Sequence, residues 1–84
     1  MKKLFNRKAT EYELSRGRKL LVSYTTPVAA YLPGRTSLTE GSYIRTERYY
    51  SRTTNRQIKS WCKTTPKVVE QQVFDTMLGE VEEI

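Results

Sequence analysis

The spacing of apolar residues changes once along this chain, and that change constrains the fold more than any other feature. Before residue 50, apolar and polar residues alternate in stretches rich in Tyr, Val and Ile, which is typical of strands. After residue 54, apolar residues recur every three or four positions, as in an amphipathic helix. This order predicts an α+β fold, with a small antiparallel sheet of three to four strands followed by two helices packed on one face.

Three strands are predicted at residues 12–14, 20–24 and 43–50, and residues 28–32 are a candidate fourth strand. Gly17 lies where a tight turn between the first two strands requires a positive φ. Pro27 precedes the fourth strand and would confine it to an edge of the sheet, or else would mark the start of the strand.

The first predicted helix begins at Thr54. Thr54 and Gln57 have the spacing of a capping box, in which both side chains satisfy free backbone N–H groups at a helix start. The apolar residues that follow would form one stripe, which consists of Ile58, Trp61 and Cys62. Trp61 is expected in the core, and Cys62 is interpreted as a buried small hydrophobe and not as a nucleophile.

The second predicted helix is marked at both ends. Thr65 and Pro66 suit the N-cap and the first helical position, and Gly79 suits the C-terminal cap. Its apolar face would consist of Val69, Val73, Phe74, Met77 and Leu78. The opposite face would consist of Gln71, Gln72, Asp75 and Thr76.

Eighty-four residues allow a single small domain, 1–84, because a chain of this length buries only about 60% of the surface that its unfolded form exposes. Its predicted parts are a basic N-terminal segment at 1–9, the sheet at 10–50, the helices at 54–78 and an acidic tail at 79–84. Charge is divided unevenly between them. Residues 1–67 contain fifteen bases and four acids, and residues 68–84 contain five acids and no base.

The composition excludes several kinds of site. The chain has no histidine and one cysteine, which removes the usual general base and the usual zinc ligands. We therefore expect no catalytic residues, no metal and no cofactor, and a chain that is not an enzyme. A single cysteine also allows no intramolecular disulfide, and no apolar run is long enough to span a bilayer. These features favour a cytoplasmic protein with no membrane partner.

The strongest candidate site is 51–56, where hydroxyl groups and two arginines crowd the predicted helix start. Free backbone N–H groups and the helix dipole favour a phosphate there. Arg52 and Arg56 could hold the phosphate bidentately, with Thr54 at the cap. An ordinary helix cap with solvated arginines explains the same pattern.

A basic stripe would extend this site along the helix. At about 100° per residue, Arg56, Lys59 and Lys63 lie within a narrow arc opposite the apolar stripe. Arg45 and Arg48, on the preceding strand, point to opposite faces, so only one of them can extend a common surface. A solvated helix face is again the alternative. The candidate nucleic-acid-binding residues are Arg45, Arg48, Arg52, Thr54, Arg56, Lys59 and Lys63.

The stretch from Leu21 to Trp61 contains Tyr24-Thr25-Thr26-Pro27-Val28-Ala29, then Thr46-Glu47-Arg48-Tyr49-Tyr50-Ser51-Arg52-Thr53-Thr54, then Arg56, Ile58 and Trp61. It resembles a group of small uncharacterised proteins of bacteriophages and related mobile elements. The resemblance implies a phage-type origin and a setting in the host-cell cytoplasm, and it implies no activity. Those proteins often have a histidine where this chain has Gln57, so no histidine-dependent role carries over.

Three functions fit these features. The leading hypothesis is a non-enzymatic accessory protein that binds the phosphates of DNA or RNA with weak sequence selectivity. The alternative is a modulator or inhibitor that binds a host enzyme, polymerase or defence complex, because Tyr and Arg are favoured at protein interfaces. The third is a minor virion or assembly component, in which the second helix pairs with a copy of itself through Val69, Val73 and Met77.

Overall fold

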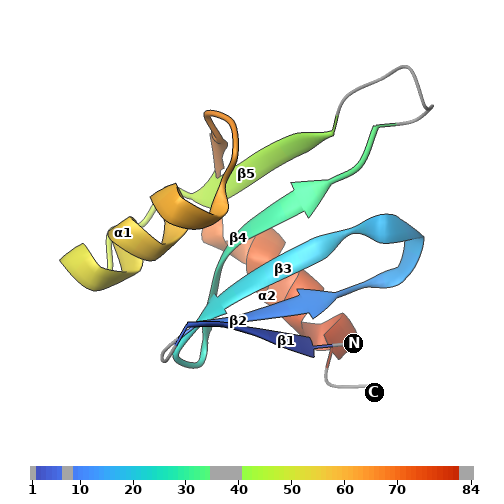
Figure 1. The fold of residues 1–84 in the computed structure, drawn as a ribbon, viewed down its shortest axis with the longest axis horizontal. Coiled ribbons are helices and arrows are strands. Elements are labelled where there is room, and N and C mark those ends of the chain that lie inside the picture. The colour runs from blue at the N-terminus through green and yellow to red at the C-terminus, as the bar shows by residue number, and fades with distance from the viewer. Residues whose placement is uncertain (1, 7–8, 35–40, 82–84) are drawn as a thin grey trace.

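The structure, a computed structural model, describes residues 2–6, 9–34 and 41–81 (Figure 1). Over these residues the chain forms six strands, β1 (Lys2–Asn6), β2 (Ala9–Glu13), β3 (Lys19–Ser23), β4 (Thr26–Leu32), β5 (Ser42–Thr46) and β6 (Lys67–Val69). It also forms two α-helices, α1 (Arg52–Trp61) and α2 (Gln71–Val81), and a short 3-10 turn, η1 (Ser15–Gly17). The α+β class is confirmed. No helix within the described residues is long and apolar enough to cross a membrane.

One sheet contains all six strands in the order in which they occur along the chain. The first five strands are antiparallel to their neighbours, and β6 runs parallel to β5, with α1 connecting the two. The predicted turn between β2 and β3 is confirmed, because Gly17 has a φ of 76°. Pro27 is the second residue of β4 and pairs with Val22 next to a register shift, so it marks a strand start and not an edge.

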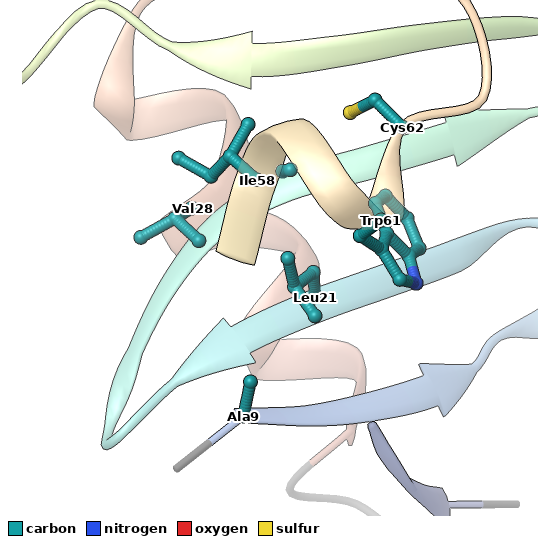
Figure 2. Close-up of a cluster of buried hydrophobic side chains, with 7 residues drawn as sticks. Ala9, Leu21, Val28, Ile58, Trp61 and Cys62 are labelled. Carbon is teal, nitrogen blue, oxygen red and sulfur yellow. The ribbon is translucent and has the colours of Figure 1, made fainter. Parts of the chain in front are cut away.

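Both faces of the sheet are apolar, because β3 contains consecutive apolar residues. Leu20 and Leu21 point to opposite sides, and both are fully buried. On one face, α1 closes a cluster that consists of Ala9, Leu21, Val28, Ala29, Ile58, Trp61 and Cys62 (Figure 2). On the other face, α2 closes a cluster that consists of Leu14, Leu20, Val22, Ala30, Ile44, Phe74 and Met77.

The two helices therefore cover opposite faces of the sheet and not one face, as was predicted (Figure 1). The physical reason is the run of apolar residues at 20–22 and 28–30, which supplies two buried faces where an alternating strand would supply one. Each helix has its own apolar surface to cover. The outward face of α1 consequently points away from α2, and α1 presents its polar side as a separate surface.

Two predicted helix starts are wrong. The N-cap of α1 is Ser51, whose Oγ accepts a hydrogen bond from the backbone N–H of Thr54 at 3.1 Å. Thr54 lies inside the first turn of the helix and is buried. Residues 67–69, expected in the first turn of the second helix, instead form β6 and pair with β5. The helix α2 starts four residues later than predicted from Pro66 and continues past Gly79.

The buried face of α2 also differs from the prediction. Gln71 was placed on the solvent side, but it is buried, and its Nε2 donates to the carbonyl oxygen of Pro27 at 2.8 Å. Val73 was placed on the apolar face, but 42% of it is exposed. The later helix start rotates this part of the sequence relative to the sheet. Part of the predicted acidic tail is helical, and within it Glu80 forms an ion pair with Arg18 at 2.6 Å; residues 82–84 lie outside the described residues.

Candidate nucleic-acid interface

Four cations line the outer side of α1. Arg52, Arg56 and Lys59 are exposed on the helix, and Lys63 is exposed just beyond its C-terminal end. At helical spacing these residues lie opposite the buried side chains of the helix, which are Thr54, Gln57, Ile58 and Trp61. We call Arg52, Arg56, Lys59 and Lys63 the basic stripe.

The basic stripe is not neutralised by neighbouring acids. The sequence of α1 contains no acidic residue. The ion pair between Arg18 and Glu80 lies elsewhere, and no cation of the stripe pairs with a carboxylate among the described residues. At roughly 1.5 Å per residue, α1 holds its charges along about 15 Å of surface. The result is a linear positive surface that is free to interact with anions.

Thr54 does not belong to this surface, contrary to the prediction. Its side chain is 4% exposed, and its hydroxyl lies 3.0 Å from the hydroxyl of Ser23 on β3. Ser51 donates a hydrogen bond to the same oxygen at 3.1 Å, and Ser23 also donates to Oε1 of Gln57 at 2.6 Å. These buried polar groups satisfy one another. Thr54 therefore positions the first turn of α1 on the sheet.

Arg45 and Arg48 have different surroundings. Arg45 lies on β5 and is half-buried, and its Nη1 donates to Oδ1 of Asn55 on α1 at 2.9 Å. This hydrogen bond connects β5 to α1 and directs the guanidinium away from the outer side of the helix. Arg48 lies beyond the end of β5 and is exposed near the start of α1. Of the two, Arg48 is the one placed to extend the basic stripe.

A groove of about 510 Å³ lies at the C-terminal end of α1, and sequence reasoning did not find it. Four of its lining residues are Lys19, Tyr31, Tyr43 and Lys63, and we call it the aromatic groove. Lys19 pairs with Tyr31 across β3 and β4, and Tyr31 pairs with Tyr43 across β4 and β5. The row is visible only once the strand register is known, because these residues are far apart in the sequence.

Three exposed tyrosines lie at the opposite end of α1. Tyr24 and Tyr50 line a smaller cavity of about 230 Å³, together with Ser51 and other residues, and Tyr49 precedes Tyr50 in the chain. Tyr49 is 68% exposed and Tyr24 is 57% exposed. Tyr24 also has a φ of 57°, a left-handed conformation that is costly for a bulky residue. We call Tyr24, Tyr49 and Tyr50 the tyrosine patch.

The model of a family of unknown function, DUF8033, matches residues 1–76. The chain belongs to that family. No curated protein and no solved structure gives a significant match to the chain. The match to DUF8033 covers the whole basic stripe, the aromatic groove and the tyrosine patch, so these surfaces all belong to the shared part of the sequence.

Within this DUF8033 domain, the aromatic side chains beside α1 are held firmly. Tyr43 contacts Tyr31, with ring centroids 5.0 Å apart, and it meets Trp61 edge to face at 5.4 Å. Nε1 of Trp61 donates to Oε1 of Glu11 on β2 at 2.7 Å. Burial raises the pKa of Tyr43 above its ordinary value, and nearby Cys62 and Tyr31 raise it further, so its phenol stays neutral at neutral pH.

Cys62 is the buried small hydrophobe that the sequence predicted. It is 9% exposed and packs in the cluster under α1. Burial raises the pKa of its thiol to about 11, and nearby Arg45 opposes this shift only in part. At neutral pH the thiol is therefore protonated and is a poor nucleophile.

Proposed function

We propose that this protein is a small, non-enzymatic accessory protein that binds nucleic-acid phosphates through the outer side of α1. The observation that carries this proposal is the basic stripe, in which Arg52, Arg56, Lys59 and Lys63 are exposed, aligned and unpaired with carboxylates among the described residues. A linear array of cations complements the regular phosphate spacing of a nucleic-acid strand. The neutral thiol of Cys62 and the absence of histidine from the sequence favour a binding role.

The proposed binding is mainly electrostatic. Phosphate contacts release condensed counterions, so affinity falls as salt concentration rises. Four contacts predict a loss of affinity of roughly 50- to 150-fold between about 50 and 200 mM salt, from slopes of about −0.7 per contact for single strands and −0.9 for duplexes. Side chains on the stripe are long and flexible cations, which suits phosphate contact and gives weak sequence selectivity.

The test is fluorescence anisotropy with labelled single-stranded DNA, duplex DNA and RNA, each titrated over this range of salt. The double variant Arg56→Gln with Lys59→Gln should weaken binding and reduce the slope of log affinity against log salt by about 2, one for each lost phosphate contact. Glutamine retains helix propensity, so α1 should remain folded.

The matched control is Arg16→Gln with Lys67→Gln. It removes the same charge from two exposed residues that lie on the β2–β3 turn and on β6, away from the outer side of α1. The proposal predicts a much smaller change in slope for this control. Equal losses in the two double variants would mean that net charge, and not the basic stripe, governs binding.

The tyrosine patch favours a second candidate, a modulator that binds a host protein such as an enzyme, polymerase or defence complex. Tyrosine is enriched at protein interfaces, and an exposed tyrosine held at a positive φ is a costly feature that suits a functional surface. For this candidate, a nuclease-treated pull-down should retain a stoichiometric partner. The variant Tyr24→Asn with Tyr49→Ser should lose that partner, and the stripe variant should keep it. Asparagine is chosen because it tolerates the φ of Tyr24.

The cellular setting is part of the same proposal. The resemblance to small phage and mobile-element proteins supports a phage-type origin and action in the host-cell cytoplasm. A virion or assembly role through self-pairing of α2 has less support, because Met77 is buried against the sheet and Val69 is partly buried there. Of the three residues proposed for that contact, Val73 is the most exposed.

A further inference from the structure

The aromatic groove joins the basic stripe at Lys63. This lysine lines the groove and also ends the row of cations along α1. A strand of nucleic acid that lies along α1 would therefore reach the groove without a break in positive charge. Lys19, which lies in the groove on β3, supplies a further cation on the other side of the tyrosines. No acidic residue is among the described residues that line the groove.

The groove offers rings to any planar group that enters it. Tyr31 and Tyr43 are only partly buried, and both line the groove. Their positions are restrained, because Tyr43 packs on Trp61, which Glu11 holds by a hydrogen bond. Gly41 contributes on the other side, since a Cβ at that position would overlap the Tyr31 ring. Restrained rings lose little conformational freedom on binding.

The size of the groove and its chemistry indicate the kind of ligand. A volume of about 510 Å³ lies within the range of roughly 300–1,000 Å³ that is typical of small-molecule sites, and it is open to the surface. Tyrosine faces flanked by lysines match an unpaired base between two phosphates. Aromatic platforms beside a positive groove are the usual means of binding single-stranded nucleic acids.

We propose that the aromatic groove receives an unpaired base, and that the protein therefore prefers single-stranded nucleic acid to duplex. This inference rests on the proposed function, since the basic stripe would hold the phosphates of the same strand. A base in a duplex is paired and stacked and cannot enter the groove, so a duplex would contact the stripe alone. Base-on-tyrosine stacking should add roughly five- to a hundredfold to the affinity for a single strand.

The first test uses the unmodified protein. We would measure affinity for a thymidine oligonucleotide, for an abasic oligonucleotide with the same number of phosphates, and for a duplex, with a uridine oligonucleotide to compare RNA with DNA. The thymidine or the uridine oligonucleotide should bind at least about tenfold more tightly than the abasic strand. Equal affinity for the base-containing and abasic strands would overturn the inference, while salt-dependent binding of both would leave the basic stripe supported. No binding of any of them would remove the proposed function itself.

The second test uses variants of the groove. Tyr31→Leu should reduce affinity for the thymidine strand toward that of the abasic strand without changing the salt slope, because no charge is lost. Lys19→Gln should lower the slope for the single strand by roughly 0.7 and leave duplex binding unchanged. The controls are Tyr12→Leu and Lys67→Gln, which change the same residue types on the α2 side of the molecule. Unchanged discrimination between thymidine and abasic strands in a folded Tyr31→Leu protein would overturn the assignment of the groove.

Discussion

Gly41 keeps room for the ring of Tyr31, and one added methyl group there should be felt. Its Cβ would overlap the Tyr31 side chain, so Gly41→Ala must displace the ring or the backbone. We expect a loss of stability of about 1–3 kcal/mol, as for other overpacked sites. Gly79→Ala is the control, because a Cβ in that position of α2 meets no other group and should stabilise the helix by about 0.5–1 kcal/mol. Urea unfolding of both variants measures the difference, and a stable Gly41→Ala protein would contradict the close contact.

Cys62 should be unreactive in the folded protein. Its thiol is buried, and its pKa of about 11 leaves almost no thiolate at pH 8. Labelling with a thiol reagent should therefore be slow in buffer and should reach the rate of an ordinary cysteine in urea. Rapid labelling of the folded chain would show that the end of α1 opens readily. The sequence already indicated this burial, because Cys62 follows Trp61 on the apolar stripe of the helix.

The elements were predictable where apolar spacing alone defines them. Alternation located β2, β3 and the start of β5, and the apolar stripe at 58, 61 and 62 located α1. The spacing did not reveal β6, since three residues next to a helix carry no period of their own, and their strand conformation depends on pairing with β5. The cap of α1 was misplaced for a related reason. Ser51 and Thr54 are both good capping residues, and only the burial of Thr54 against Ser23 decides between them.

The contact between α2 and the β2–β3 turn should respond to pH. Arg18 donates hydrogen bonds to Glu80, which lowers the pKa of Glu80 below its ordinary value. The stabilisation is thus present above the ordinary carboxyl pKa, and it is lost as pH falls through the lowered pKa of the folded state. Glu80→Gln should slightly lower the midpoint of thermal unfolding at pH 7, and the difference from the unmodified protein should vanish in acid. Glu47→Gln, which removes an exposed carboxylate on the other side of the chain end of β5, should have a smaller effect.

At the scale of the whole molecule, the sequence contained the information for two buried faces, but the prediction did not use it. Leu20, Leu21 and Val22 are consecutive, and so are Val28, Ala29 and Ala30. A strand buried on both sides reads in this way. The basic stripe was predictable from helical spacing, since Arg56, Lys59 and Lys63 share one side of any helix through them. The aromatic groove was not, because Lys19, Tyr31 and Tyr43 become neighbours only through the register of three strands.

Two clusters on one sheet should unfold together, because they share the same strands. Leu21→Ala removes a buried side chain under α1, and Leu20→Ala removes its neighbour under α2. Each should cost about 2–5 kcal/mol. Trp61 is the single tryptophan and reports on the α1 side, whereas far-ultraviolet circular dichroism reports on the whole chain. The two signals should give one common transition in both variants, as expected of a two-state domain. A tryptophan transition that came first in Leu21→Ala alone would show that α1, with its basic stripe, detaches from a sheet that α2 still holds.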